Sequence, residues 1–213
     1  MPRSTATPEP APASYITHLS KDKKLKTIIT GPLQELTAQK NISLKLIRSI
    51  MSQQLSTKVS SVIYARFLEL YGGKEPTAQQ ILDTPPLTLR GIGLSNAKVT
   101  YVQNVAAFVI AEKLTDSKLK KMSDSDIITY LTQIKGVGRW TVEMLLIAYL
   151  GREDIFAIDD WGLQQAMIKL YKLNREDKKA FREQLLYISA QWAPYRTHAS
   201  RYLWQWKDNT PDQ

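Results

Sequence analysis

The chain has 213 residues, of which 43% are hydrophobic and 23% charged, which suits one domain or two closely packed lobes around a buried core. It contains no cysteine, which excludes disulfides, thiol nucleophiles and cysteine-ligated zinc or iron–sulfur sites. The 29 Lys and Arg residues against 20 Asp and Glu give a formal net charge of +9. That charge is typical of proteins that meet a polyanion such as nucleic acid, but it suits a merely soluble basic surface equally well.

Several common site types lack their sequence markers. There is no apolar run of about 18 residues, so we expect no membrane span. The only two histidines, His18 and His198, are too few for a histidine metal cage. Neither a GxxxxGK[ST] nor a GxGxxG loop is present, so the usual signs of a nucleotide cofactor are missing, and we expect no organic cofactor.

After a proline-rich segment, the sequence predicts helices almost throughout. Residues 1–13 hold four of the ten prolines, cannot bury a face, and are predicted to be a disordered tail. Helical periodicity then predicts helices at about 15–29, 42–53, 57–71, 96–114, 127–133, 139–150, 161–171, 176–192 and 195–207, with a short helix after Thr77. No period-2 strand pattern stands out. We therefore predict an all-α fold of about ten helices.

One of these helices, over 57–71, has a clear apolar spacing. Five of its residues are predicted to share one buried face: Val59, Val62, Ile63, Phe67 and Leu70.

Two glycines, Gly136 and Gly138, stand one residue apart between two predicted helices. Glycine lets backbone N–H groups approach a ligand closely, and the free N–H groups of the following helix face outward. Lys135 and Arg139 add positive charge beside them. A glycine turn between two helices explains the pair alone, but the whole pattern favours a phosphate site. The expected phosphate-binding residues are Lys135, Gly136, Val137, Gly138, Arg139 and Thr141.

The segment Ile134-Lys-Gly-Val-Gly-Arg-Trp-Thr141 resembles the helix–hairpin–helix motif of the DNA glycosylase superfamily. Asp160, 22 residues after Gly138, matches the family's aspartate, although the usual Pro and Gly before it are missing. The segment 48–56 resembles the loop that such enzymes push into the minor groove, and 89–95 and 194–196 resemble the alkyl-purine branch. Within this branch the chain looks nearest to the small yeast-type 3-methyladenine glycosylases.

This resemblance implies a two-lobed helical bundle over residues 14–213. The hairpin lobe would cover about 44–145, and the second lobe would combine 14–43 with 146–213. The implied activity is base excision: an alkylated purine of the 3-methyladenine or 7-methylguanine type is flipped out of duplex DNA and hydrolysed from its sugar.

Asp160 is the implied catalytic residue, because a fixed carboxylate stabilises an oxocarbenium-like transition state and can orient water. A plain helix-capping role is a strong alternative, since Asp160 precedes a predicted helix. The adjacent Asp159 is expected to be an ordinary cap or a solvent residue.

The residue that fills the gap left by the flipped base would be Gln54, Leu55 or Ser56. We favour Gln54, because a glutamine can fill the hole and also hydrogen-bond the orphaned base. The alternative is that Gln53 and Gln54 merely end one helix before Ser56 caps the next.

The base pocket would be aromatic, since electron-rich rings attract cationic alkylpurines. Its expected members are Trp140, Met144, Trp161 and Tyr195, and core packing is the alternative for each aromatic ring. Trp192, Trp204 and Trp206 are assigned to the core. By resemblance, the backbone carbonyls of Thr132, Ile134 and Val137 would hold a structural Na⁺ or K⁺.

Lyase relatives carry a Schiff-base lysine where this chain has Trp140, so we expect a monofunctional enzyme. The expected partner is duplex DNA with alkylated or abasic sites, bound by a monomer in the nucleus, or in the cytoplasm if the yeast-like resemblance does not hold. Ser56, Met144 and the altered loop before Asp160 leave open a binder of abasic or damaged DNA with little turnover. A helical protein-interaction domain is a more remote alternative.

Overall fold

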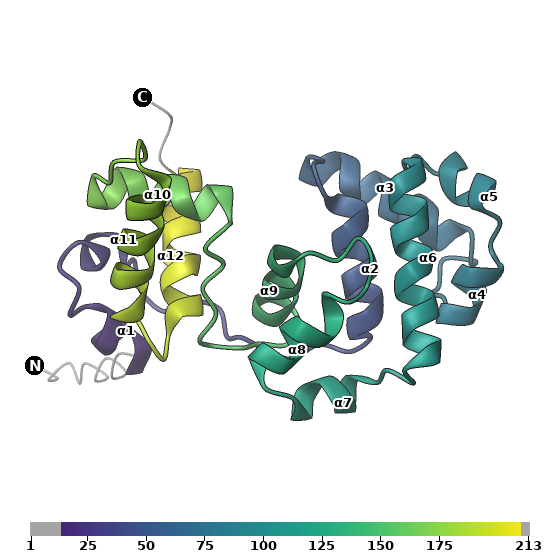
Figure 1. Ribbon diagram of the computed structural model, residues 1–213, viewed down its shortest axis with the longest axis horizontal. Helices are drawn as coiled ribbons and strands as arrows, with labels where there is room; N and C mark the ends of the chain where they lie inside the picture. The colour runs from purple at the N-terminus through teal and green to yellow at the C-terminus, as the bar shows by residue number, and fades with distance from the viewer. Residues whose placement is uncertain (1–13, 210–213) are drawn as a thin grey trace, which may run out of the picture. The chain divides into compact units, whose positions relative to one another are not determined.

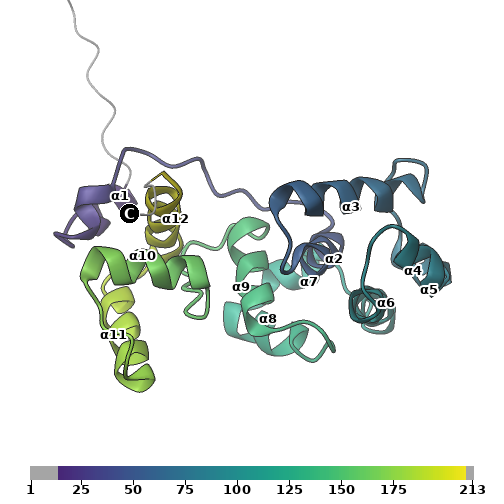
Figure 2. The same cartoon turned by 90° about the horizontal axis from the view of Figure 1, so that it is seen from above.

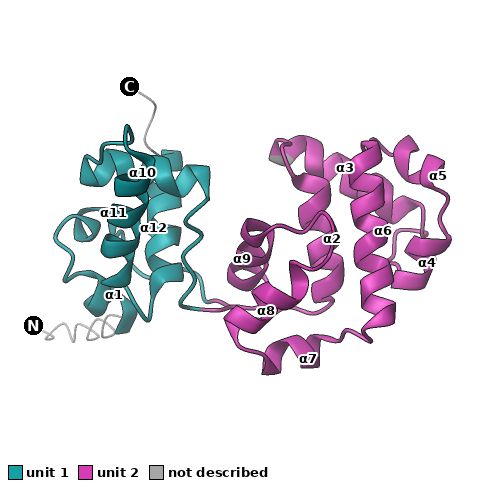
Figure 3. Cartoon of the chain, in the orientation of Figure 1, with its two compact units in different colours: residues 1–35, 153–213 teal, residues 36–152 magenta. Residues whose placement is uncertain are grey.

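The computed structural model describes residues 14–209, so the tail predicted over 1–13 lies outside the described residues. All regular elements between residues 14 and 209 are helices, which confirms the all-α prediction. The described residues divide into two compact units: unit 1 comprises 14–35 and 153–209, and unit 2 comprises 36–152 (Figure 3). The sequence had placed these divisions near 44 and 145. Among the helices described, none has the length and apolar character needed to cross a bilayer.

Unit 2 contains α2 (Ile42–Ser52), α3 (Thr57–Glu69), α4 (Ala78–Asp83), α5 (Pro86–Gly91), α6 (Asn96–Ala111), α7 (Asp116–Lys121), α8 (Asp124–Leu131) and α9 (Arg139–Ala148) (Figure 1). Polar side chains start most of them: Ser56, Thr77, Ser95, Thr115 and Ser123 each accept a hydrogen bond from a backbone N–H of the following helix. The short helix predicted after Thr77 is therefore confirmed as α4.

The core of unit 2 lies where α2 packs against α6 and α9. Ile50 of α2, Val102 of α6 and Leu145 of α9 are fully buried. The predicted apolar face of α3 is only partly correct, because Ile63 and Phe67 are buried while Val59, Val62 and Leu70 are exposed. The main neighbour of α3 is α2, which lies on one side of this helix (Figure 2).

Unit 1 contains α1 (Ser14–Leu19), a 3₁₀ helix η1 (Leu25–Ile28), α10 (Trp161–Tyr171), α11 (Lys178–Ala190) and α12 (Arg196–Asn209). Trp192 and Tyr202 are the largest of its fully buried side chains, which confirms the core assignment of Trp192. Trp204 and Trp206 are only partly buried and pack against the same core.

The single helix predicted over 15–29 is wrong, because the chain turns between α1 and η1. Asp22 in this turn accepts hydrogen bonds at Oδ1 from the backbone N–H groups of Lys24 and Leu25. Its Oδ2 accepts from the Tyr171 hydroxyl at 2.6 Å and from the Trp192 indole at 3.1 Å. These side-chain bonds replace the helical ladder and anchor the turn to the core of unit 1.

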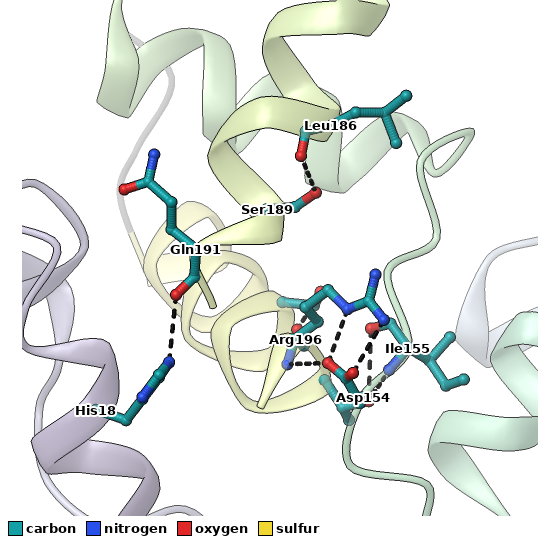
Figure 4. Close-up of polar contacts among 9 residues, drawn as sticks. His18, Asp154, Ile155, Leu186, Ser189, Gln191 and Arg196 are labelled. Carbon is teal, nitrogen blue, oxygen red and sulfur yellow. Dashed lines mark hydrogen bonds and ion pairs between the residues drawn. The ribbon is translucent and has the colours of Figure 1, made fainter. Parts of the chain in front are cut away.

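Hydrogen bonds and an ion pair fix the segment that leads to α10. The Arg196 guanidinium donates to both carboxylate oxygens of Asp154, at 2.7 and 2.9 Å, and Ile155 N–H donates to the Thr197 hydroxyl (Figure 4). Burial opposes the charged form of Asp154, but the hydrogen bonds from Arg196 outweigh it and lower the pKa of Asp154. The His18 Nε2–H donates to the Gln191 carbonyl in the same view. The start of α12 thereby holds residues 153–155, five residues before Asp160.

Candidate active site and nucleic-acid interface

The turn that joins α8 to α9 lies against α6 (Figures 1 and 2). Gly136 has a φ of 102°, and a Cβ at this position would come within 2.1 Å of the Tyr101 ring. The Asn104 side chain donates to the Lys135 carbonyl at 3.0 Å. Gly136 is therefore required by the packing of the hairpin on α6, independently of any ligand.

Gly138 has a different role. It is the N-cap of α9, with an ordinary φ of −89°, and a Cβ built on it would meet no atom within 4 Å. Neither its dihedral angles nor its packing requires glycine. The residue leaves the N-terminus of a ten-residue helix uncovered, with the side chains of Lys135 and Arg139 exposed nearby. Such an end suits an anion.

The hairpin residues expected to bind phosphate do not all face outward. The Val137 side chain is buried, and its N–H donates to the Ile134 carbonyl at 2.9 Å. Thr141 is 2% exposed, and its hydroxyl accepts from the Gln53 amide at 3.2 Å. The outward members are thus Lys135, Gly138 and Arg139.

Arg139 also has a partner within its own helix. Its Nε donates to Oε1 of Glu143 at 2.7 Å, and Glu143 is buried while the Arg139 side chain remains largely exposed. This ion pair fixes the base of the Arg139 side chain and compensates the buried carboxylate.

The connection between α2 and α3 carries the residues predicted to insert into DNA. Ser56 caps α3 by accepting from Val59 N–H, so the capping alternative is correct for this residue. Gln54 adopts a left-handed φ of 58° and is exposed, and Leu55 is 37% exposed. Gln54 and Leu55 therefore form the accessible tip of the loop.

Asp160 is the N-cap of α10, as the alternative reading proposed. Its Oδ1 accepts from Leu163 N–H at 2.7 Å and from the Trp204 indole at 2.9 Å. A Cβ on Gly162 would lie 3.3 Å from Oδ1 and 3.6 Å from the Trp204 ring, so this glycine packs closely beside the bond. Capping and catalysis do not exclude each other, because both need a carboxylate held in one orientation.

Asp159 lies next to this residue but makes a different contact. Its carboxylate is exposed and pairs with Arg182 of α11 at 2.7 Å. The expectation of a plain cap or a solvent residue thus misses an ion pair.

Trp140 and Met144 lie one turn apart on α9, so they share a face of this helix. Trp140 is 38% exposed and Met144 is partly buried. Both belong to unit 2.

Trp161 follows Asp160 directly and is 58% exposed. The Arg175 guanidinium lies 4.5 Å from its ring centroid. Trp161 also lines a cavity of about 320 Å³ with Trp206, Lys169 and Lys207. One arginine therefore lies over this ring and two lysines line the adjoining cavity, an environment that opposes a cationic base.

Tyr195 lies in another part of unit 1. Its ring packs near those of Tyr15, His18 and His198. Trp204, which contacts Asp160, is nine residues further along the chain, or about 14 Å of helical rise. These contacts do not bring Tyr195 together with Asp160.

Residues 47–190 match the HhH-GPD superfamily of base excision DNA repair proteins, and the chain belongs to this family. DNA-3-methyladenine glycosylase 1 of Schizosaccharomyces pombe is 36% identical over 163 residues, which cover 76% of this chain and 70% of that protein. Alkylbase DNA glycosidase-like protein mag2 of the same yeast is 34% identical, with 75% of each chain covered.

A solved structure is similar over nearly the whole length. It is that of the S. pombe 3-methyladenine DNA glycosylase in complex with abasic DNA, with a TM-score of 0.82 and 31% identity. The match covers 93% of this chain and 98% of that one. The resemblance to the alkyl-purine branch is confirmed, and the roles of single residues stay predictions.

Proposed function

We propose that the protein is a monofunctional DNA glycosylase that removes alkylated purines of the 3-methyladenine or 7-methylguanine type from duplex DNA. The observation that carries this proposal is the Asp160 carboxylate, which two donors hold at the start of α10. The family and the named activity of its relatives support it.

The hairpin serves as the anchor. The uncovered N-terminus of α9 at Gly138 accepts a backbone phosphate, and Lys135 and Arg139 add charge attraction. The exposed tip of the α2–α3 loop then occupies the gap that the flipped nucleotide leaves. Gln54 is the member of that loop able to hydrogen-bond the unpaired base opposite.

Asp160 acts on the sugar. As the glycosidic bond breaks, its electron pair leaves with the base and positive charge develops on the deoxyribose. The carboxylate stabilises this charge and orients the water that attacks the anomeric carbon. An alkylated purine is already cationic and leaves as a neutral base, so no general acid is required.

The base is stacked by Trp140, with Met144 beside it on the same face of α9. Trp161 serves less well for a cationic base, because Arg175 already lies over its ring. We assign the monofunctional outcome to the same position: an indole at Trp140 supplies no amine to attack the sugar.

We propose that carbonyl groups of the hairpin hold a structural Na⁺ or K⁺. Thr132 is the C-cap of α8, whose last turn carries no basic side chain to offset its carbonyl end. The Ile134 carbonyl already accepts from Val137 N–H, yet a carbonyl oxygen has a second lone pair. The carbonyls of Thr132, Ile134 and Val137 would hold the ion, and its positive charge would attract the approaching phosphate.

A second candidate function is the binding of abasic sites with little turnover. It is favoured by the Arg175 guanidinium, which lies 4.5 Å from the Trp161 ring centroid and opposes the stacking of a cationic base there. An abasic sugar flips easily because no base stacking opposes it. In either case the protein would act as a monomer, in the nucleus.

Single-turnover incubation with duplexes that contain 3-methyladenine, 7-methylguanine or ethenoadenine separates the two candidates. The enzyme predicts release of free base and alkali-labile sites, with no strand cleavage before alkali. Tight binding of an abasic analogue without release of any of these bases would contradict the enzyme and support the binder.

A further inference from the structure

Lys98, in the first turn of α6, reaches the end of α2. Its ammonium group donates to the backbone carbonyls of Met51 at 2.9 Å and of Gln53 at 2.7 Å. Both carbonyls lie at the C-terminal end of α2, where the helix dipole favours a cation. Lys98 is partly buried, and this burial lowers its pKa. The amine thus fixes the backbone immediately before Gln54.

A second bond joins the same segment to the hairpin. The Gln53 side-chain amide donates to the Thr141 hydroxyl at 3.2 Å. Thr141 is buried in the first turn of α9, two residues after Arg139. Figure 2 shows the α2–α3 connection beside α9. The loop tip and the hairpin helix are therefore linked directly by side chains.

The backbone between these two bonds is in an unfavourable conformation. Gln54 has a φ of 58°, in the left-handed region that residues with a Cβ adopt only uncommonly. Leu55 N–H donates to the Ser52 carbonyl at 3.1 Å across the turn. This conformation leaves Gln54 exposed before any DNA is bound.

We propose that Lys98, Gln53 and Thr141 are positioning residues that form a clamp on the Gln54 loop. The clamp holds the loop in its inserting conformation and ties it to the strand-gripping hairpin. The two elements then meet the duplex as one preorganised surface, so the loop is not ordered at the cost of binding energy. This inference rests on the proposed insertion of Gln54.

Each bond alone also has a simpler interpretation. The Lys98 bonds would only cap α2, and the Gln53 bond would only give the buried Thr141 hydroxyl a partner. The clamp makes a further prediction: its loss should weaken binding to an abasic duplex more than binding to an intact duplex. Only a duplex that lacks a base has a space in the stack for the loop to fill.

The experiment measures the dissociation constants for a duplex with a tetrahydrofuran abasic analogue and for the matched intact duplex. The readout is the ratio of the two. Thr141→Val removes the acceptor with little change of shape, and we expect the preference for the abasic duplex to fall about fivefold. Lys98→Met removes a charged donor to two carbonyls and should lower the preference about tenfold.

Matched variants separate positioning from stability. Thr141→Ser keeps the hydroxyl and should retain the wild-type preference for the abasic duplex. Lys74→Met removes one exposed charge beyond the far end of α3, so both constants should stay as in the wild type. Gln53→Met breaks the same bond from the other side. Its effect and that of Thr141→Val should be strongly non-additive in the double variant. Thermal unfolding of each variant establishes that it is folded.

Two results would overturn the clamp. If Gln54→Ala lowers the preference while Thr141→Val, Gln53→Met and Lys98→Met leave it unchanged, the loop inserts without a clamp and the proposed function stands. If Gln54→Ala itself leaves the preference unchanged, the insertion fails and the clamp fails with it. Base release, measured separately, then decides whether the proposed activity survives.

Discussion

The Trp204 indole donates its N–H to Oδ1 of Asp160 at 2.9 Å, so the last helix of the chain orients the carboxylate on which the proposed chemistry depends. The Leu163 N–H approaches the same oxygen at 2.7 Å, and two donors from different elements fix the group more firmly than one. Gly162 packs closely beside this contact, since a Cβ there would lie 3.3 Å from Oδ1.

Trp204→Phe tests this orientation, since phenylalanine keeps most of the ring but loses the donor. We expect the single-turnover rate of base release to fall about tenfold, in line with the loss of one hydrogen bond to a charged group, with little change in DNA affinity. Tyr187→Phe, on the exposed side of α11, is the matched control and should change neither quantity. An unaltered rate in Trp204→Phe would show that the indole does not position Asp160.

The two hairpin glycines should respond in opposite ways to alanine. Gly138→Ala places a methyl group in open space at the N-terminus of α9, so it should cost less than about 1 kcal/mol of stability. It should still weaken DNA binding several-fold, because the methyl group meets the phosphate. Gly136→Ala collides with the Tyr101 ring and should destabilise the fold itself. Paired titration and thermal unfolding check both, and normal DNA affinity in Gly138→Ala would contradict the phosphate site.

Salt dependence tests the charge of the anchor. The logarithm of the association constant should fall linearly with the logarithm of salt concentration. Lys135→Gln should reduce the magnitude of that slope by about one, because one phosphate contact is lost. A slope equal to that of the wild type would remove Lys135 from the interface.

His198 should make stability depend on pH. It is buried against Tyr15, with Tyr195 and Arg201 nearby, and burial together with the Arg201 charge lowers the pKa of His198 to about 4 from 6.5. The unfolded chain therefore takes up a proton near pH 6.5 that the folded chain accepts only near pH 4. The stability that the neutral His198 contributes to the folded chain is fully present above pH 6.5. It is lost as the pH falls toward 4, up to about 3 kcal/mol.

Urea unfolding of the wild type and of His198→Phe between pH 7.5 and 4.5 measures this dependence. Phenylalanine keeps the stacked ring and does not titrate, so its stability should fall less over this range. The lowered pKa values of Asp22 and Asp154 act below their ordinary value of 3.8, outside that window. Equal slopes for the two proteins would refute the assignment.

Local signals in the sequence predicted the helices and the hairpin well. The pattern around Gly138 placed the start of α9, and the helix Trp161–Tyr171 was predicted with the bounds that the structure shows. The helices α5 and α7 have six residues each, too few for a periodic pattern to reveal them, and about ten helices were expected where the described residues form twelve and η1.

Contacts between distant residues could not be predicted. The break after α1 depends on Asp22, whose partners Tyr171 and Trp192 lie 149 and 170 positions away. Trp204 is 44 positions from Asp160, and the sequence indicated only a core residue. Lys98 likewise carried no motif, because its role depends on where the end of α2 lies in space.

The account depends above all on Asp160, and one paired measurement tests it. A duplex with a single 3-methyladenine is mixed with excess wild-type protein or Asp160→Asn, and bound DNA and released base are followed in the same sample. Asparagine retains an oxygen that can accept from Leu163 and Trp204, so the fold and the DNA affinity should persist while release falls at least a hundredfold. Release by Asp160→Asn at the wild-type rate would contradict the catalytic role of this carboxylate.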